Sequence, residues 1–377
     1  MKDINVSKIS EHGIVNRTEN SLFRYQGWPS VCRDENGVLY VVSSSFRLAH
    51  VCPFGKTAMY KSTDNGKTWS KPMIINDTYL DDRDAGILYM GNGRLLVTWF
   101  SHPAKEYLTT YREWIESDSG ELGKAMLSRY GDIPEKFSAG GSFVRISEDY
   151  GVTWSETVRV PVSSPHGPSL CKDGTLIYLG KEMYSSDMEI PEEKGVIASY
   201  KSEDGGYTWE KLGVLKKPEN ISWNHFHEPH IVELEDGTLF GMIRAEGDGV
   251  YHGFTVYSTV SNDGGKTWSK WKNIDVSGSP PHLLLHSSGA LVCSLGRREK
   301  PYGENAIVSY DNGKTWSERY IIDENADSDD LGYPASVELG DGSILTVYYQ
   351  QYKDGEKSDE FTSVLFTKWK LKCYENN

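Results

Sequence analysis

Residues 62–69 read STDNGKTW, and this stretch decides the fold because its pattern returns along the chain. The pattern Ser-x-Asp-x-Gly-x-Thr-Trp occurs five times, in copies that begin at Ser62, Ser147, Ser202, Ser261 and Ser309. Its Asp can accept backbone N–H groups across a tight turn, its Gly suits a positive φ, and its Trp can pack between neighbouring sheets. Five matches at eight positions therefore predict a repeat protein, in which each copy, called a Ser-x-Asp box below, closes one hairpin.

A second unit alternates with the boxes and consists of a turn dipeptide ending in glycine, followed by a short apolar run. Its six copies end at Gly37, Gly93, Gly174, Gly237, Gly289 and Gly342. Each copy precedes one box except the last, so a strand near the N-terminus is expected to complete the final sheet and remove the open edges. The sequence predicts an all-β fold, a six-bladed β-propeller of four-stranded antiparallel blades.

One spacing is longer than the others. Gly93 and Gly174 are 81 residues apart, whereas the other successive turn glycines are 52 to 63 apart. The excess covers about residues 103–138, and helix-forming residues between Glu106 and Met126 predict a helical insertion in the second blade. It could be a packing ornament or a lid over a central pocket. We expect one domain over residues 1–377 that contains this insertion.

Composition and charge restrict the classes of partner. The chain is 38% hydrophobic, and its formal net charge of −14 disfavours nucleic acids and anionic membranes. Its N-terminal 15 residues lack the apolar core of a secretory signal, which favours a cytoplasmic location unless a signal has been removed. The five cysteines are widely spaced without a CxxC pair, so they predict isolated thiols.

The turn glycines also locate a rim where side chains from different blades should meet. Nine positions before them stand Trp28, Asp84, Pro165, Glu228, Pro280 and Tyr333. Seven to ten positions after three of them stand Arg47, Arg244, Arg297 and Arg298. Both positions lie at the end of a hairpin opposite its turn. Glu228 and Arg244 should therefore meet in one blade, joined by Tyr333, Asp84 and other arginines from neighbouring blades.

This set of residue types indicates a particular chemistry. Arginines that converge in an acidic protein would be stabilised by a carboxylate, which a guanidinium binds in bidentate fashion. A tyrosine beside a glutamate can act as a nucleophile, because the carboxylate can take the phenolic proton. We expect the arginines to lower the pKa of Tyr333 from its usual value of about 10. A neutral phenol also suits an anionic substrate, since an attacking carboxylate would meet the substrate's own charge.

The same segments resemble the bacterial sialidases over nearly the whole chain. The resemblance rests on the boxes, on EPHIVEL at 228–234 with its following turn, and on YPAS at 333–336 before Asp341-Gly342. It implies a retaining exo-glycoside hydrolase that releases terminal sialic acid, in which three arginines hold the substrate carboxylate. The roles that it implies are Tyr333 as nucleophile, Glu228 as its base, and Arg244, Arg298 and Arg24 as the arginines.

The sequence departs from that family at the general acid. Where sialidases place an arginine followed shortly by the catalytic aspartate, this chain has Arg47 and then His50, with no carboxylate before Asp64. His50 could be the acid, because the ordinary pKa of histidine is nearest neutrality, or Asp84 could reach in from the next blade.

Two further assignments concern substrate binding. Either Arg24 or Arg47 could complete the arginine clamp, because both stand near the inner end of the first blade. His166 is expected to line the same pocket and to donate or accept a hydrogen bond with the substrate.

Several alternatives remain open from the sequence. The chain could be a sialidase-fold glycosidase or lyase for another acidic glycan with His50 as acid/base, or a non-catalytic propeller that binds glycans. Glu228 with Arg244 could be a structural ion pair, and Tyr333 could be ordinary packing. We expect an acidic oligosaccharide or sialoglycoconjugate as substrate. No cofactor or metal is expected, since His227 and His230 would lie on opposite faces of a strand.

Overall fold

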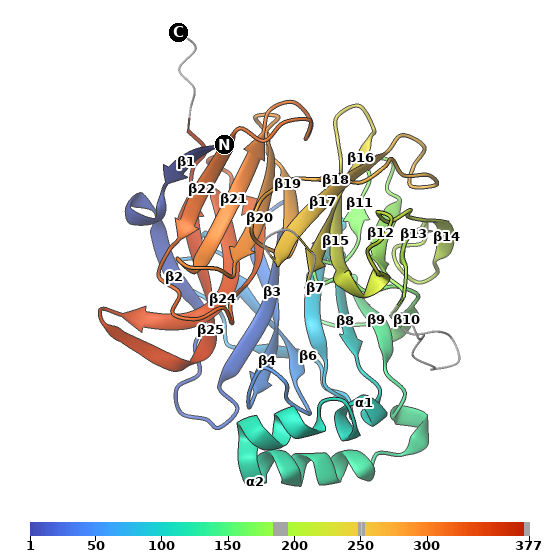
Figure 1. The fold of residues 1–377 in the computed structure, drawn as a ribbon, viewed down its shortest axis with the longest axis vertical. Helices are drawn as coiled ribbons and strands as arrows, with labels where there is room; N and C mark the ends of the chain where they lie inside the picture. Colours follow the sequence, from blue (N-terminus) through green and yellow to red (C-terminus); the bar gives the residue numbers. More distant parts are fainter. Residues whose placement is uncertain (184–194, 248–249, 251–252, 373–377) are drawn as a thin grey trace.

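The computed structural model describes residues 1–183, 195–247, 250 and 253–372. Six sheets are arranged around a central axis (Figure 1), each antiparallel between its sequential strands. The predicted six-bladed propeller is confirmed. Of the five cysteines, Cys32, Cys52, Cys171 and Cys293 are free thiols, and Cys373 lies outside the described residues.

The innermost strand of each blade comes first in the chain, and the outermost comes last. Blade 1 contains β3 (Tyr25–Arg33), β4 (Leu39–Arg47), β5 (Lys56–Ser62) and β6 (Met73–Asn76). Blade 2 contains β7 (Arg83–Tyr89), β8 (Leu95–Ser101), β9 (Gly141–Ser147) and β10 (Val158–Val160). Blade 3 contains β11 (Ser169–Leu170), β12 (Leu176–Lys181), β13 (Ile197–Ser202) and β14 (Glu210–Val214).

The other three blades follow the same order. Blade 4 contains β15 (Phe226–Glu233), β16 (Leu239–Glu246), β17 (Phe254–Ser261) and β18 (Lys272–Asn273). Blade 5 contains β19 (Pro281–Leu285), β20 (Leu291–Arg297), β21 (Gly303–Ser309) and β22 (Glu318–Asp323). Blade 6 contains β23 (Gly332–Glu338), β24 (Ile344–Asp354) and β25 (Lys357–Trp369), and its fourth strand is β2 (Glu11–Asn16).

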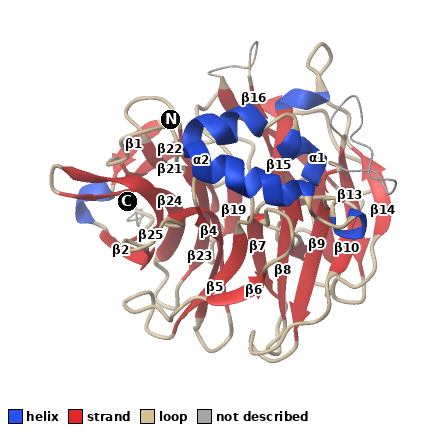
Figure 2. Cartoon of the chain, turned by 90° about the horizontal axis from the view of Figure 1, so that it is seen from below, coloured by secondary structure: helices blue, strands red, loops and turns tan. Residues whose placement is uncertain are grey.

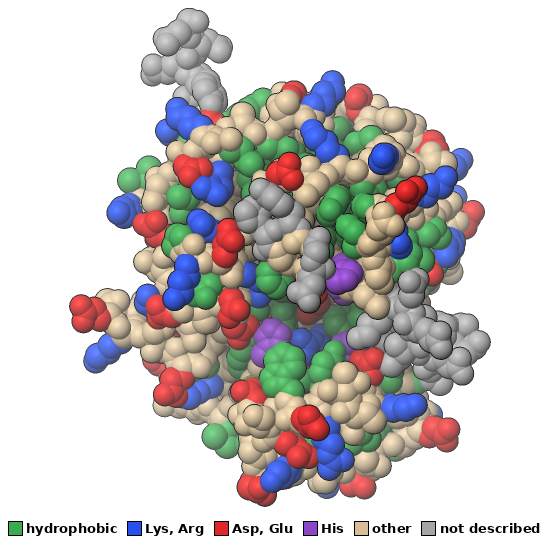
Figure 3. Space-filling view, viewed as in Figure 1, with side chains coloured by type: hydrophobic (Ala, Val, Ile, Leu, Met, Phe, Trp, Pro, Cys, Tyr) green, Lys and Arg blue, Asp and Glu red, His purple; other side chains and the backbone are tan. Residues whose placement is uncertain are grey.

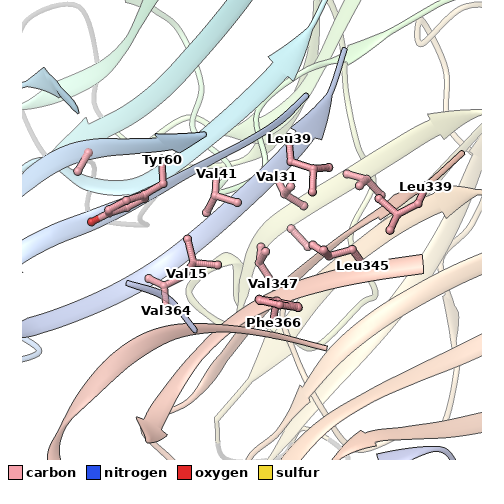
Figure 4. Close-up of a cluster of buried hydrophobic side chains, with 13 residues drawn as sticks. Val15, Val31, Leu39, Val41, Tyr60, Leu339, Leu345, Val347, Val364 and Phe366 are labelled. Carbon is pink, nitrogen blue, oxygen red and sulfur yellow. The ribbon is translucent and has the colours of Figure 1, made fainter. Parts of the chain in front are cut away.

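The ring closes through the N-terminal segment. β2 pairs antiparallel with β25, as predicted, and its Val15 enters an apolar cluster that blades 1 and 6 share (Figure 4). The shortest N-terminal strand, β1 (Lys2–Asn5), pairs in parallel with β22 and adds a fifth strand to blade 5. The sequence did not predict β1, because no turn or box marks it.

Apolar clusters lie between consecutive blades all around the ring. The tryptophans of the five boxes pack against the clusters that their blades share with the preceding blade: Trp69, Trp154, Trp209, Trp268 and Trp316. The cluster between blades 5 and 6, which no box tryptophan reaches, contains Trp369 from β25 instead. Burial of these side chains between blades supplies the main force that holds the ring together.

The Ser-x-Asp boxes form the turn that their residue types predict. In the first box, Asp64 Oδ1 accepts the Thr68 backbone N–H at 2.9 Å, and its Oδ2 accepts the Thr68 hydroxyl at 2.6 Å. These bonds favour the charged carboxylate and lower the pKa of Asp64 to about 2. The other four boxes repeat the hydroxyl bond at 2.6 Å. The boxes therefore stabilise turns and take no part in the candidate site.

The insertion between β8 and β9 is helical, as predicted, and lies across one side of the propeller (Figure 2). It contains α1 (Ala104–Leu108), α2 (Arg112–Gly131) and a 3-10 turn over Glu135–Phe137, and α2 is kinked at Gly120. Ile115, Leu127 and Tyr130 pack with residues of blade 1 and the segment that follows it. Within the described part of the chain, no helix is long and apolar enough to cross a bilayer.

Candidate active site

A shared backbone feature places four side chains at the propeller axis. Trp28, Asp84, Glu228 and Tyr333 have φ values of 51°, 51°, 48° and 50°, in the left-handed region that non-glycine residues rarely adopt. Each lies at a bulge in the first strand of its blade, where the pairing with the second strand shifts register. The sequence places all four nine positions before a turn glycine, so one repeated kink turns equivalent residues toward the centre.

Tyr333, Glu228 and Arg244 form the core of the site. Tyr333 Oη donates a hydrogen bond of 2.5 Å to Glu228 Oε1. Arg244 Nη1 donates to Glu228 Oε2 at 2.5 Å and to Tyr333 Oη at 3.0 Å. The three residues come from blades 4 and 6 and line a cavity of about 240 Å³. Glu228 is thus placed to take the proton of Tyr333, and Arg244 to stabilise the resulting charge.

The expected effect on the pKa of Tyr333 is wrong in direction. Arg244 and Arg298 do lower the pKa, but burial and the charge of Glu228 outweigh them, so the pKa of Tyr333 is well above 10. The phenol is therefore protonated at rest. A nucleophilic role for Tyr333 requires proton transfer to Glu228 during the attack.

Asp84 lines the same cavity and is 7% exposed. Its Oδ1 is buried without a hydrogen-bond partner among the described residues. Burial and the nearby charge of Glu228 raise the pKa of Asp84 to about 7, against the opposing effect of Arg83. Asp84 can hold a proton near neutral pH, as a general acid must.

His50 lies at the mouth of this cavity and is held by several contacts. Its Nδ1 is 2.9 Å from Asp330 Oδ1 and 3.0 Å from Tyr25 Oη, and its ring stacks on Trp114 at 5.8 Å. Burial lowers its pKa from the usual value, more than Asp330 raises it. His50 is therefore less suited than Asp84 to donate a proton near neutrality.

An outer vestibule of about 580 Å³ adjoins the cavity and shares His50 and Trp114 with it. Arg24 and Arg298 line the vestibule. Arg298 lies 5.9 Å from the ring of Tyr333 and donates to the Asp329 carbonyl at 2.8 Å. The Nε atoms of Arg244 and Arg298 are buried without hydrogen-bond partners among the described residues.

Arg24 is further from the core residues. It is 3.3 Å from Glu360 and lies 4.6 Å from the centre of the Phe361 ring. Its role as a substrate-binding arginine stays a prediction. Arg24 lines the vestibule without contacting Tyr333, whereas Arg298 lies 5.9 Å from the Tyr333 ring.

Arg47 does not reach the cavity. Its side chain is fully buried, its Nη1 pairs with Asp81 Oδ1, and its Nη2 donates to Asp81 Oδ2 at 2.7 Å and to the His50 carbonyl at 3.0 Å. This ion pair joins β4 to the segment between β6 and β7 and supports the loop that carries His50, and Arg47 does not line the cavity. The structure places Arg83 on the cavity instead, with its guanidinium 4.4 Å from the Trp28 ring.

His166 also lies elsewhere than expected. It lines a different cavity together with His230 and His282, and its ring is 4.8 Å from that of His282. The reason is that β11 comprises only Ser169–Leu170, so His166 precedes the strand in a turn closed by the Gly167 N–H and the Ser164 carbonyl. Counting from the turn glycine does not locate the rim in this blade.

Three residues of the site were not predicted. Glu246, which pairs with Arg244 Nη2, could have been found because it lies two positions further along β16 on the same face. Arg83 directly precedes Asp84, which is the only sequence signal for it. Trp114 is 50% exposed, and its contact with His50 joins segments that sequence spacing cannot relate. Figure 3 shows the face of Figure 1 hollowed near its centre, where histidine and basic side chains are visible.

Comparison with known proteins agrees with this architecture. A sequence model of the BNR repeat-like domain family matches residues 122–346, more than half of the chain, and a model of the BNR/Asp-box repeat matches residues 60–71. The chain is a BNR/Asp-box propeller with a sialidase-like fold. It belongs to the BNR repeat-like domain family. No curated protein matches its sequence.

Solved structures share the fold at low sequence identity. A protein of unknown function from Dyadobacter fermentans is 20% identical with a TM-score of 0.74, over 96% of this chain and 98% of its own. The NanB sialidase of Streptococcus pneumoniae is 16% identical with a TM-score of 0.68, over 95% of this chain and 70% of its own. The intramolecular trans-sialidase of Ruminococcus gnavus is 15% identical with a TM-score of 0.64, over 97% of this chain and 98% of its own.

Proposed function

We propose that this protein is a retaining exo-glycoside hydrolase that removes a terminal carboxylated sugar, with sialic acid as the first candidate. The observation that carries the proposal is the Tyr333 Oη to Glu228 Oε1 hydrogen bond of 2.5 Å, made inside a cavity that also holds Asp84. The shared fold with sialidases supports the substrate class.

In the first step, Tyr333 Oη attacks the anomeric carbon while its proton passes to Glu228 Oε1. Asp84 gives its proton to the glycosidic oxygen, and the bond between that oxygen and the anomeric carbon breaks. The products are a glycosyl-tyrosine and the free aglycone. Arg244 is within 3.0 Å of the Tyr333 oxygen and stabilises negative charge there.

In the second step, Asp84, now ionised, takes a proton from water that attacks the anomeric carbon. Tyr333 leaves and recovers its proton from Glu228. Two displacements at one carbon give a product with retained configuration. We assign the binding of the sugar carboxylate to Arg298 and Arg244, which both lie next to Tyr333.

Proton NMR of the first product formed tests this proposal. The protein is incubated with an aryl α-sialoside and, in parallel, with an oligouronide whose sugars are joined through O4, and the anomer is assigned before mutarotation. We expect the retained anomer of the sialic acid. An inverted anomer would contradict a tyrosine nucleophile. An unsaturated sugar from the oligouronide would indicate a lyase, because β-elimination removes the C5 proton and breaks the C4–O bond. Saturable binding of sialoside with no product from either compound would indicate a glycan-binding propeller.

A further inference from the structure

A row of polar side chains, called the polar row below, leads from blade 3 into the candidate active site: Lys181, His227, Glu246 and Arg244. Lys181 ends β12 and is 3% exposed. Its ammonium group donates to the carbonyls of Trp223 and Phe226 at 3.1 and 2.7 Å. It also donates to His227 Nδ1 at 3.2 Å. Because an ammonium group has donors and no acceptor, His227 Nδ1 accepts, and the neutral imidazole carries its proton on Nε2.

His227 in turn contacts a carboxylate that lines the cavity. Its Nε2, which bears the proton, lies 3.3 Å from Glu246 Oε1, and both side chains line the cavity of about 240 Å³. Glu246 is the last residue of β16 and lies two positions after Arg244 on the same face of that strand. The second Glu246 oxygen, Oε2, accepts a bond from Arg244 Nη2. The carboxylate therefore lies between an imidazole and a guanidinium, each of which attracts one of its oxygens.

The orientation of the Arg244 guanidinium depends on this carboxylate. Nη2 is paired with Glu246, whereas Nη1 donates to Glu228 Oε2 at 2.5 Å and to Tyr333 Oη at 3.0 Å. Because a guanidinium is planar and rigid, a fixed Nη2 also fixes the direction of Nη1. Nη1 is the group that stabilises charge on the Tyr333 oxygen in the proposed mechanism.

His227 is not suited to transfer protons itself. Burial and the charge of Lys181 lower its pKa to about 3; Arg244 adds to this effect and Glu246 opposes it. The imidazole is therefore neutral near neutrality, and each of its nitrogens faces a member of the polar row. These contacts favour a role in holding Glu246 over a role as acid or base.

We propose that Glu246 and His227 are positioning residues for Arg244, and that Lys181 holds them in place from blade 3. The inference rests on the proposed function, because it concerns the step in which Tyr333 becomes the nucleophile. Loss of the polar row should let the guanidinium turn away from Tyr333 Oη, where negative charge develops in the transition state. The effect should therefore appear mainly in kcat and less in KM.

Two substitutions of His227 separate positioning from general packing. Glutamine can replace the neutral imidazole, because its amide carbonyl can accept from Lys181 while its amide N–H group donates to Glu246. With an aryl α-sialoside, His227→Ala should lower kcat about tenfold or more, and His227→Gln should recover most of the loss. Glu246→Ala should lower kcat at least as much, since it removes the direct partner of Arg244. The proposal is wrong if both His227 substitutions lower kcat equally or if only KM changes.

Nitrogen NMR of the histidine side chains tests the polar row without any turnover. With the spectrum of His227→Gln as the assignment, wild-type His227 should be the neutral tautomer with its proton on Nε2. Lys181→Met should raise the pKa of His227, because the charge of Lys181 lowers it. If Lys181→Met does not fold, Lys181→Gln, which keeps hydrogen-bond donors without the charge, gives the same comparison. Lys211→Met is the matched control in the same blade and should change neither this pKa nor kcat, because Lys211 pairs with Glu182 at 2.5 Å.

The two measurements separate failure of this inference from failure of the proposed function. If the wild type releases no aryl alcohol, hydrolysis of sialosides is wrong, and the tautomer and pKa of His227 still decide whether the polar row exists. If loss of the Lys181 charge leaves the pKa of His227 unchanged, or if wild-type His227 carries its proton on Nδ1, the polar row is wrong even in an active enzyme.

Discussion

Four residues at the centre of the propeller share a left-handed backbone conformation: Trp28, Asp84, Glu228 and Tyr333. Each such conformation costs about 1–3 kcal/mol for a non-glycine residue. The cost recurs where chemistry-bearing side chains face one cavity, and the equivalent positions of the other two blades are Pro165 and Pro280, which cannot adopt a positive φ. The strain therefore marks the candidate site and not the propeller repeat as such.

The acid role of Asp84 makes a prediction about pH. Its pKa is raised to about 7, and a general acid must be protonated, so kcat/KM should fall as pH rises above about 7. Asp84→Asn should remove this dependence and lower turnover of an alkyl glycoside by about 10²- to 10⁴-fold, with a smaller loss for an aryl glycoside whose leaving group needs no proton. Steady-state kinetics across pH measure both effects.

Asp82→Asn is the matched control for Asp84. Asp82 is also buried and its pKa is also raised to about 7, but its oxygens accept bonds from Asn76, Thr78 and Ser101, and Asp82 does not line the cavity. The Asp82→Asn protein that folds should keep the pH dependence of kcat/KM. If kcat/KM of Asp84→Asn still falls above pH 7 and kcat/KM of His50→Gln does not, His50 is the general acid.

At the scale of elements, the helical insertion is part of the candidate site. The Tyr107 and Tyr130 hydroxyl groups both bond to Asp81, the partner of Arg47, which fixes the insertion to blades 1 and 2. From this anchored segment Tyr111 and Trp114 reach the cavity lining. The insertion therefore forms a wall of the cavity in this structure and is more than a packing ornament.

Trp114→Ala tests that wall. The exposed indole should stack on the sugar next to the cleaved bond, and loss of about 0.5–1.5 kcal/mol of aromatic contact should raise KM for an oligosaccharide roughly two- to tenfold with kcat nearly unchanged. Trp114→Phe should restore most of the affinity. An unchanged KM in Trp114→Ala would show that the insertion does not contact the substrate.

At the scale of the whole molecule, stability depends on closure of the ring by β2. Val15 is 6% exposed in the cluster between blades 1 and 6, whereas its neighbour Ile14 is 37% exposed. Val15→Ala should lower the free energy of unfolding by about 1–2 kcal/mol, from lost apolar burial and the cavity left behind. Denaturant unfolding measures this loss.

Ile14→Ala on the same strand is the control for closure. Its effect should stay within about 0.5 kcal/mol, because an exposed side chain loses little on truncation. Equal effects of the two substitutions would show that β2 does not pack into a shared core.

Local repeats explain how much of this architecture the sequence could predict. The boxes and turn glycines are set by nearby residues, so blade number, closure and the rim positions of Asp84, Glu228 and Tyr333 followed from spacing. The pairing of Arg47 with Asp81 joins blade 1 to the segment between β6 and β7, and the turn before β11 depends on how short that strand is. Neither property is encoded in local spacing, so Arg47 and His166 were misplaced.

The nucleophilic role of Tyr333 is the central claim, and turnover of an aryl α-sialoside by the wild type and by Tyr333→Phe tests it most directly. Phenylalanine keeps the ring in its packing with Trp28 and Tyr349 and removes only the hydroxyl. The account predicts release of the aryl alcohol by the wild type and a loss of roughly 10³-fold or more in the variant. Release at a similar rate by both proteins would contradict the nucleophilic role of Tyr333, and no release by the wild type would contradict sialic acid as the substrate.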